Sequence, residues 1–314
     1  MQQIKTLTLP VAMLAGFLFS GFLARLNPVT PYMIFVMLFV TFCRISPRDL
    51  RFSPMFVWLL LIQVLGAVAL YLGLSIFGEV AAEGVMMCVF APTAVSSVVI
   101  GSMLGANVAT MASYSLVSNT AVAVVAPVFF SFVGRQADMP FIESFLHIFS
   151  RVGPLLILPF AVAFLLQKVA PRAHDAVRRR QIISFYIWAV SLMIVTGQTV
   201  EFVKAQDGNN YALEICIAAG AFVICILQFA LGRRIGGRYG DTVAGGQSLG
   251  QKNTVLAIWM SQTYMHPLAS IGPASYVLWQ NIVNSWQLWV KNRRDAESSG
   301  GRRSPAAGSK SSPR

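Results

Sequence analysis

Residues 245–254 read Gly-Gly-Gln-Ser-Leu-Gly-Gln-Lys-Asn-Thr and lie within the predicted membrane span Val243–Met265. Leu249 is the only large aliphatic side chain in this segment, so the segment is a poor lipid-facing helix. Irregular backbone is tolerated at membrane depth only where protein surrounds it. We therefore predict an unwound segment that is buried in the protein. Three glycines are its expected helix breaks: Gly245, Gly246 and Gly250.

The composition places this segment in a membrane protein. The chain has 314 residues, of which 56% are hydrophobic and 11% are charged, and its mean hydropathy is +0.65. A soluble domain carries about 25% charged residues. A chain this apolar has too few polar side chains to cover the surface of a soluble globule. In a bilayer the surface can be apolar. The predicted fold class is an all-α, polytopic membrane protein.

Apolar stretches of membrane-spanning length recur along the chain. Each crossing of a bilayer takes about 20 helical residues. We predict ten spans: Leu7–Leu26, Pro31–Ile45, Met55–Phe77, Gly84–Leu104, Asn107–Val133, His147–Lys168, Ile182–Val203, Tyr211–Leu231, Val243–Met265 and Pro267–Val290. A cleaved signal peptide is the alternative for the first. We favour a retained helix, because its apolar stretch exceeds a signal-peptide core and no clear small-residue cleavage motif follows.

The distribution of charge predicts the orientation of these spans. Positive residues accumulate on the cytoplasmic side of membrane proteins. With the N-terminus in the cytoplasm, the inside loops and the C-terminal end hold most of the basic residues: Arg44, Arg48, Arg51, Lys168, Arg172, Arg178, Arg179, Arg180, Arg233, Arg234, Arg238, Lys291, Arg293 and Arg294. Both termini are therefore expected in the cytoplasm, at a plasma or inner membrane. The same pattern explains the net charge of +12 without a nucleic-acid partner.

A second polar interruption lies in the fourth span, where Pro92 begins the sequence Pro-Thr-Ala-Val-Ser-Ser. Proline removes a helix donor and disfavours helix at the residue before it, so Pro92 is a further expected break. The fourth and ninth spans hold corresponding places in two groups of five spans. Because five is odd, the second group has the opposite orientation in the membrane. Interrupted spans in such halves indicate a midplane transport site. We predict repeats at 1–133 and 134–294, then a disordered cytoplasmic tail at 295–314.

Catalytic and metal-binding patterns are missing from the sequence. The four cysteines lie in or beside apolar spans and have the character of small buried hydrophobes. The three histidines lie in different segments without ligand spacing, and neither a phosphate loop nor a nucleophile elbow occurs. We therefore expect neither an enzyme nor a metal or other cofactor. Most serines and threonines of the fifth and tenth spans are expected to bridge neighbouring helices.

Two stretches of the chain resemble the bile acid:sodium symporter superfamily. The first is Pro-Thr-Ala-Val-Ser-Ser-Val at 92–98 with Gly-Ala-Asn-Val-Ala at 105–109; the family shows Pro-Gly-Gly-Thr-x-Ser-Asn and then Gly-Asn-x-Ala. The second is Ser-Leu-Gly-Gln-Lys-Asn-Thr-Val-Leu-Ala at 248–257, where the family shows Glu-x-Gly-x-Gln-Asn-Ser-Gly-Leu-Ala. The family's tenth helix is similar to Pro-Leu-Ala at 267–269 and Trp-Gln-Asn-Ile at 279–282.

The resemblance covers nearly all of residues 7–290 and implies ten helices in a 5+5 inverted repeat. It implies a core of helices 3–5 and 8–10, in which the broken helices 4 and 9 cross, and a moving panel of helices 1, 2, 6 and 7. The family's substrates are organic anions such as bile acids, steroid sulfates and small carboxylates. By this resemblance, the substrate-binding residues are Asn253, Lys252, Val95, Ser96 and Thr254. The ion-binding or ion-replacing residues are Lys252, Ser248, Gln63, Ser97 and Ser115.

Several departures from the family fall on its sodium ligands, which normally hold two ions. The glutamate of helix 9 falls on Ser248, the glutamine on Lys252, and the asparagine of helix 4 on Val98. A carboxylate is lost and an ammonium is gained, although sodium needs oxygen ligands. We therefore interpret Lys252 as a fixed charge in place of sodium and expect altered or absent sodium coupling. Proton coupling and a lysine that reaches to the membrane surface are alternatives.

The function that these features predict is secondary transport of an organic anion by alternating access. The expected partners are a small organic anion and the lipid bilayer. A sodium-coupled symporter is the runner-up, and a membrane-embedded anion sensor that does not transport is an alternative of another class. The sequence carries no indication of an oligomeric state.

Overall fold

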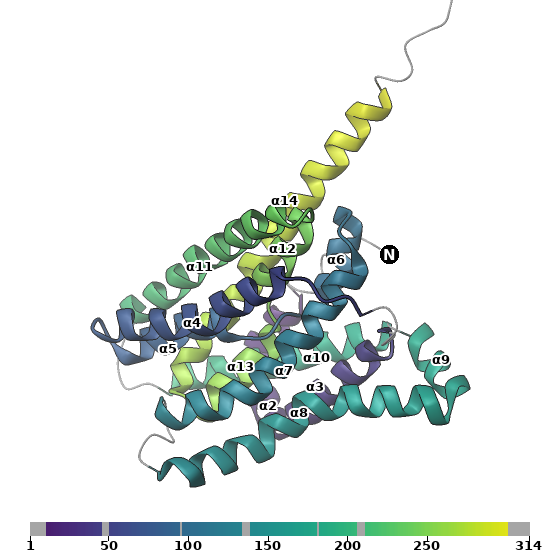
Figure 1. The fold of residues 1–314 in the computed structure, drawn as a ribbon. Helices are drawn as coiled ribbons and strands as arrows, with labels where there is room; N and C mark the ends of the chain where they lie inside the picture. Colours follow the sequence, from purple (N-terminus) through teal and green to yellow (C-terminus); the bar gives the residue numbers. More distant parts are fainter. Residues whose placement is uncertain are drawn as a thin grey trace, which may run out of the picture.

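The computed structural model describes residues 11–45, 50–94, 96–133, 139–180, 182–205 and 211–300, which are helical and contain no strand (Figure 1). Residues 11–18 are helical. The helices that follow, with η for 3-10 helices, are α2 (Ser20–Leu23), η1 (Ala24–Val29), α3 (Thr30–Phe42), α4 (Met55–Ser75), α5 (Glu79–Phe90), α6 (Ser96–Leu104), α7 (Val108–Phe132), α8 (Phe141–Val169), α9 (Pro171–Arg179), α10 (Ile182–Lys204), α11 (Tyr211–Arg238), α12 (Thr242–Gly250), α13 (Thr254–Tyr264), η3 (Pro267–Ser270) and α14 (Ile271–Gly300).

Six of the helical stretches are long and apolar enough to cross a bilayer. They are Ser20–Phe42, which comprises α2, η1 and α3, together with α4, α7, α8, α10 and α11. Large apolar side chains are exposed on their surfaces, among them Leu65 on α4 and Ile215 on α11. Lipid is the solvent in which so much exposed apolar surface is stable. The chain is therefore an integral membrane protein with several membrane-spanning helices, as its composition predicts.

Two predicted spans fall on interrupted pairs of shorter helices. α5 has 12 residues and is followed by the nine residues of α6. α12 has nine residues and is followed by the 11 residues of α13. At about 1.5 Å per residue, none of these four helices reaches across the ~30 Å hydrocarbon core of a bilayer. Each pair brings an irregular segment into the interior of the helix bundle.

The helices pack in two groups. The junction group consists of α4–α7 and α11–α14; within it α4 packs on α5, and α11 packs on α5, α12 and α14. The flanking group consists of α2, α3, α8 and α10, in which α3 lies against both α8 and α10. Figure 1 shows α4, α5 and α11 on one side of the molecule and α3 and α8 on the other. The consecutive helices α7 and α8 pack together and so connect the two groups.

The prediction that Gly245 and Gly246 break a helix is wrong, because both lie inside α12. They allow α12 to approach α11 closely instead. A Cβ atom at Gly245 would meet the carbonyl oxygen of Gly232 and would lie 2.6 Å from the Cα of Gly236. Gly250 is the last residue of α12, and a Cβ atom there would meet the ring of Phe229 at 2.5 Å. The break follows at residues 251–253.

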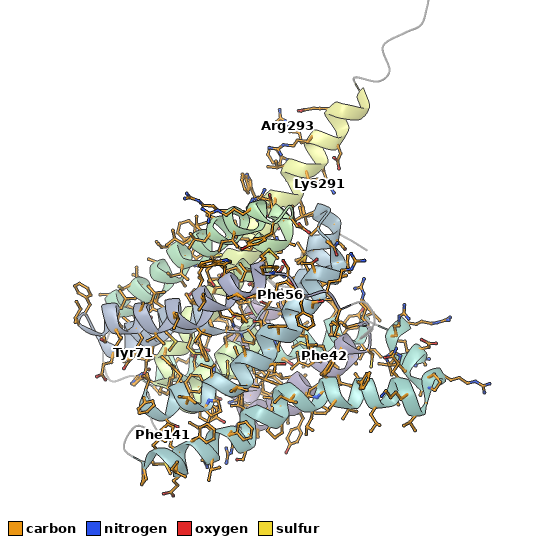
Figure 2. The ribbon with its side chains drawn as sticks, viewed as in Figure 1. Phe42, Phe56, Tyr71, Phe141, Lys291 and Arg293 are labelled. Carbon is orange, nitrogen blue, oxygen red and sulfur yellow. The ribbon has the colours of Figure 1, made fainter. Side chains whose placement is uncertain are left out.

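The predicted disordered tail also begins too early, because α14 continues as a helix to Gly300. Arg293 and Glu297 form an ion pair of 3.1 Å at the i, i+4 spacing that stabilises a helix surface. The guanidinium of Arg293 also lies over the ring of Trp289. Figure 2 shows Lys291 and Arg293 on the part of α14 that extends beyond the other helices. Residues 301–314 lie outside the described part of the chain.

Candidate functional site at two joined helix breaks

The irregular segments after α5 and α12 lie side by side. Thr93 and Lys252 form an isolated antiparallel backbone bridge between them. Two backbone hydrogen bonds flank this bridge, from the N–H of Ala94 to the oxygen of Gln251 (3.0 Å) and from the N–H of Asn253 to the oxygen of Pro92 (2.8 Å). Backbone that leaves a helix at membrane depth must find protein partners. Each interruption thus supplies hydrogen bonds that the other one needs.

Side chains cap the last carbonyl oxygens of α5. A helix leaves its final four carbonyls without partners of its own. The donors come from three other segments: Gln228 Nε2 to Cys88 (3.0 Å), Lys252 Nζ to Val89 (2.8 Å), and Gln63 Nε2 to Phe90 (3.1 Å) and to Ala91 (3.2 Å). The interrupted end of α5 is therefore satisfied by protein groups, and one of them is a cation.

Lys252 is buried, with 1% of its surface exposed. Besides its bond to Val89, its backbone N–H donates to Oε1 of Gln280 over 2.9 Å. Among the described residues, no carboxylate forms a salt bridge with its ammonium. A cation at a helix C-terminus is stabilised by the helix dipole by about 0.3–1 kcal/mol, and by up to ~2 kcal/mol when partly buried. Lys252 is thus a buried basic group at the end of α5, and its side chain does not extend to the protein surface.

Gln63 is held entirely by protein groups. It is buried on α4, and its Oε1 accepts hydrogen bonds from Tyr114 Oη (3.2 Å) and Ser118 Oγ (2.9 Å), both on α7. Since its Nε2 donates to the end of α5, this one side chain joins three helices. Both acceptor positions of Oε1 are engaged. An ion could bind this oxygen only by displacing one of the two hydroxyl groups.

The other predicted ion-site residues are buried serines on three different helices. Ser97 on α6, Ser115 on α7 and Ser248 on α12 are fully buried, and their hydroxyl oxygens have no hydrogen-bond partner among the described residues. Asn119, one turn after Ser115, bonds through Nδ2 to the oxygens of Ser115 (2.7 Å) and Thr93 (3.3 Å), while its Oδ1 has no described partner. Unpaired buried polar atoms are uncommon in proteins. These four oxygens remain available to a ligand or an ion.

Asn253 and Thr254 begin α13. The Oδ1 of Asn253 accepts the N–H of Leu256 at 3.3 Å, which makes Asn253 the N-cap of this helix. Thr254 is its first residue, and both residues are buried. The N-terminal end of a helix carries partial positive charge and favours anions. The structure therefore brings two of the predicted substrate-binding residues to an electropositive helix end.

Ser96 is the first residue of α6, as Thr254 is of α13, and its surface is exposed. Its Oγ accepts a hydrogen bond from Nε2 of Gln251 over 3.0 Å, so the starts of α6 and α13 belong to one hydrogen-bonded cluster. Val95 lies outside the described residues. Of the predicted site residues, Ser96, Lys252, Asn253 and Thr254 lie at the junction of the two helix breaks.

Thr93 is the residue of the junction for which the sequence predicts no individual role. Its Oγ1 donates to the backbone oxygen of Ser248 over 2.6 Å, and its N–H donates to Ser118 Oγ over 3.1 Å. The sequence predicts no individual role for Gln280 either, which bonds to the backbone N–H and oxygen of Lys252. The signal available in the sequence is the same for both residues, namely a polar side chain in an apolar span.

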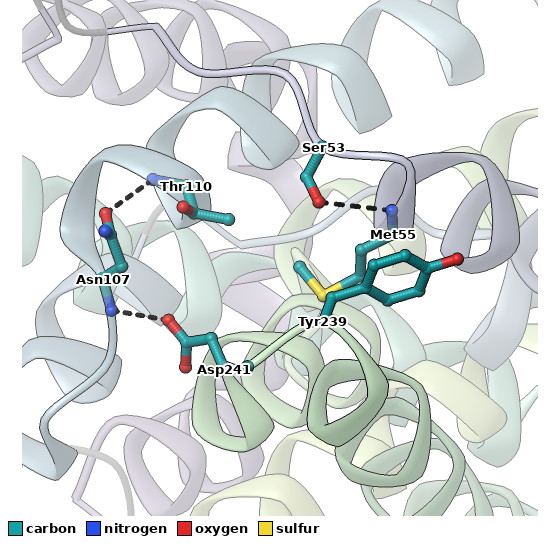
Figure 3. A pocket seen from close by; sticks show the side chains of 7 residues that line it. Ser53, Met55, Asn107, Thr110, Tyr239 and Asp241 are labelled. Carbon is teal, nitrogen blue, oxygen red and sulfur yellow. Dashed lines mark hydrogen bonds between the residues drawn. The ribbon is translucent and has the colours of Figure 1, made fainter.

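A small cavity lies elsewhere in the junction group. Its volume is about 240 Å³, and it is lined by Ser53, Met55, Asn107, Thr110, Tyr239, Gly240 and Asp241 (Figure 3). The carboxylate of Asp241 accepts the N–H groups of Asn107 and Ala244, both over 2.8 Å, and thereby ties the start of α7 to the start of α12. None of the predicted site residues lines this cavity. Its carboxylate is engaged in capping helices, so the joined helix breaks remain the candidate site.

The described residues contain no group of three histidine, cysteine, aspartate or glutamate side chains that could hold a metal ion. The chemistry of the site is instead that of one buried ammonium, several hydroxyl and amide groups, and two helix N-termini. No family model matches the chain, and no curated protein matches it. The hydrogen bonds and burial at the joined breaks are therefore the observations from which a function is argued.

Proposed function

We propose that this protein is a secondary transporter of organic anions that works by alternating access, similar to the bile acid:sodium symporter superfamily. The observation that supports this best is the buried ammonium of Lys252 at two joined helix breaks. In secondary transporters, substrate sites are typically formed by interrupted helices that meet inside the protein. An ionisable residue at membrane depth is costly, so it is a functional candidate by default.

The finer architecture is part of the same proposal. We infer ten spans in two inverted halves, 1–133 and 134–294, in which α5–α6 is the fourth span and α12–α13 is the ninth. The two interrupted helices would cross at the Thr93–Lys252 bridge. The junction group would correspond to the family's core, and the flanking group to its moving panel. Both termini would lie in the cytoplasm of a plasma or inner membrane.

The electrostatics of the junction favour an anionic substrate. The N-terminal ends of α6 and α13 direct partial positive charge toward it, and Lys252 adds a charge that no described carboxylate neutralises. Ser96, Asn253 and Thr254 supply hydroxyl and amide groups for hydrogen bonds. The Nζ of Lys252 is buried against Val89. Lys252 therefore attracts the anion through its electric field and not by direct contact. In an interior of low dielectric constant such a field is stronger than in water.

Two of the residues at the family's sodium positions do not fit a sodium ion. Lys252 places an ammonium where the family has an amide oxygen, and Ser248 lacks the family's carboxylate. The Oε1 of Gln63 is already occupied by two hydroxyl donors. Two sodium ions and one carboxylate leave a net charge of +1 in the family site, and Lys252 alone leaves the same charge. The junction can therefore attract an anion without bound sodium.

A sodium-coupled symporter is the second candidate, and one observation favours it. The hydroxyl groups of Ser97, Ser115 and Ser248 are buried without described partners, and hydroxyl oxygens can ligate a cation. These are the positions that the resemblance assigns to ion binding. They are all neutral, however, and no described hydrogen bond joins their hydroxyl groups to one another or to Lys252. The first candidate therefore accounts for more of the site.

The experiment that tests the proposal is a thermal-shift screen of the purified protein against organic anions, in sodium and in choline buffers. A ligand that binds the folded state raises its melting temperature by mass action. Stabilisation by a selective set of anions in both buffers supports the first candidate, and stabilisation that requires sodium supports the second. Uptake of the best anion into proteoliposomes then separates a transporter from a sensor. The absence of stabilisation by every anion class would contradict both candidates.

A further inference from the structure

Three polar residues outside the joined helix breaks connect the two helix groups. Gln262 on α13 donates through Nε2 to Thr199 Oγ1 (3.0 Å) and to the carbonyl oxygen of Val195 (3.1 Å), both on α10. Ser270, in η3, places its Oγ 3.2 Å from Thr199 Oγ1. Gln262 and Ser270 belong to the junction group, and Thr199 belongs to the flanking group. All three side chains are buried.

We propose that Gln262, Thr199 and Ser270 form a reversible latch that holds the α13 side of the transport pathway closed. This inference rests on the proposed function, because a latch between two helix groups has a role only if the groups move relative to each other. It assigns gating to residues outside the site, and to an interface that the anion does not contact.

Packing on the two sides of the joined breaks differs in the way that such a latch requires. On one side, α13 and η3 pack against α10, and α13 also packs against α3, so the two groups are in contact there. On the other side, α6 packs against α7, α12 and α14, which all belong to its own group. Its outward face carries exposed Val99 and Met103, each 40% exposed, and exposed Ser102. Among the described residues, the two groups therefore pack together at α13, whereas α6 packs mainly on its own group.

The hydrogen bonds of the latch are weak enough for it to open. Gln262 bonds to α10 only through Nε2, and its buried Oε1 has no partner among the described residues. A buried acceptor without a partner disfavours the closed arrangement relative to a fully paired one. The remaining hydrogen bonds each shift an equilibrium only by about twofold to tenfold. A contact of this strength can bias two arrangements of rigid helix groups without locking either of them.

Distances between spin labels test the latch without any substrate. In the full chain with Cys216→Ser, which removes the exposed cysteine, one pair of labels is placed at Phe77→Cys and Ala205→Cys, at the ends of α4 and α10 on the α13 side. A second pair is placed at Ser102→Cys on α6 and Ile183→Cys on α10. All four positions are exposed. Distances are measured by double electron–electron resonance in lipid nanodiscs.

Gln262→Leu should lengthen the first distance and shorten the second, with the open population rising about fivefold or more. Thr199→Val, which keeps the shape of the side chain, should act in the same direction and by less. Gln247→Leu is the matched control, because Gln247 is similarly buried but, among the described residues, its side chain bonds only to Asn284 and Gln287 of its own group. It should leave both distances unchanged.

Unchanged distances in both Gln262→Leu and Thr199→Val would overturn the latch, as would equal shifts in the Gln247→Leu control. If Gln262→Leu fails to fold, Thr199→Val and Ser270→Ala provide the same test. The proposed function fails by a different measurement, which is the absence of anion binding by the wild-type protein. Anion binding with unmoved labels would therefore reject the latch alone.

Discussion

The ammonium of Lys252 donates to the carbonyl oxygen of Val89 over 2.8 Å, although the two residues are 163 positions apart in the chain. This bond places a positive charge at the C-terminal end of α5 and joins the two interrupted helices. The ammonium has no carboxylate partner among the described residues, so its charge is available to the junction as a whole. Anion binding at this site should therefore depend on the charge of Lys252 more strongly than the stability of the folded protein does.

The first prediction is that Lys252→Gln weakens anion binding by about tenfold or more, the equivalent of ~1.4 kcal/mol. The amide is one bond shorter than lysine, but it avoids the cost of burying a charge, which offsets a weakened bond to Val89, so the melting temperature should not fall. The measurement is the anion-dependent thermal shift. Lys291→Gln is the control, because Lys291 also donates to a helix-end carbonyl, Met103, over 2.9 Å, but it is only partly buried and lies outside the junction. Equal losses of binding in both variants would contradict a special role for Lys252.

The second prediction concerns Asn253, which has two roles that can be separated. Asn253→Ala should weaken anion binding and also lower the free energy of unfolding by about 0.5–2 kcal/mol, because the N-cap of α13 is lost. Asn253→Asp keeps a capping oxygen but adds a negative charge, so it should weaken anion binding with a smaller effect on stability.

Asn107→Ala is the matched control for this experiment. Asn107 caps α7 by accepting the N–H of Thr110 over 3.1 Å, away from the joined breaks. It should lose a similar amount of stability and retain anion binding. If Asn253→Asp bound the anion as well as the wild type, the substrate would have to lie elsewhere.

The third prediction is that anion binding is insensitive to replacement of sodium by choline. The double variant Ser248→Glu/Lys252→Gln restores the family's carboxylate and amide, and its anion binding should become sodium-dependent. Ser248→Glu alone should gain less, because Lys252 would pair with the new carboxylate and compete with sodium. Titration of each variant with sodium at fixed anion concentration provides the measurement. A steep, saturable sodium requirement in the wild type would reject the idea that Lys252 replaces the ion.

The fourth prediction concerns the contact between α11 and α12. Gly245→Ala should destabilise the protein by about 1–3 kcal/mol or more, because a Cβ atom would collide with the backbone of Gly232 and Gly236. Gly73→Ala on α4 is the control, since a Cβ atom there meets nothing within 4 Å. That change should be neutral or stabilising by about 0.5–1 kcal/mol, as alanine suits a helix better than glycine. Thermal unfolding in one detergent compares the two, and equal stabilities would show that α12 can shift.

The fifth prediction is topological. Ala176, on the exposed face of α9 next to Arg178, should lie in the cytoplasm together with both termini. In a Cys216→Ser background, Ala176→Cys should react with a membrane-impermeant thiol reagent in inside-out vesicles and remain unlabelled in intact cells. Labelling from outside in intact cells would show that every span has the opposite orientation.

The class of the fold could be predicted from composition and periodicity because a bilayer demands long apolar helices of any sequence that crosses it. The positions of polar groups could be predicted for the same reason, since few such groups are tolerated in apolar spans. Residues 92–97 and 245–254 were identified in this way. The end of α5 just before Pro92 is likewise a local consequence, because proline limits the backbone wherever it occurs.

The role of each glycine was decided by tertiary structure. A glycine permits both a helix break and a close approach of two helices, and the sequence around it does not distinguish these outcomes. Gly245 and Gly246 lie within a helix because α11 presents Gly232 and Gly236 opposite them. The break falls instead at residues 251–253, where backbone partners at Pro92 and Ala94 replace the lost helical bonds.

The composition and local sequence of this chain determined that it is an α-helical membrane protein with polar interruptions in two of its spans. Only the tertiary structure decided that these interruptions bond to each other, that Lys252 caps α5, and that Gln262 contacts α10. The physical reason is that apolarity and backbone preference act over a few residues, whereas a hydrogen bond requires a partner at about 3 Å. Which residue stands there depends on how the whole chain packs.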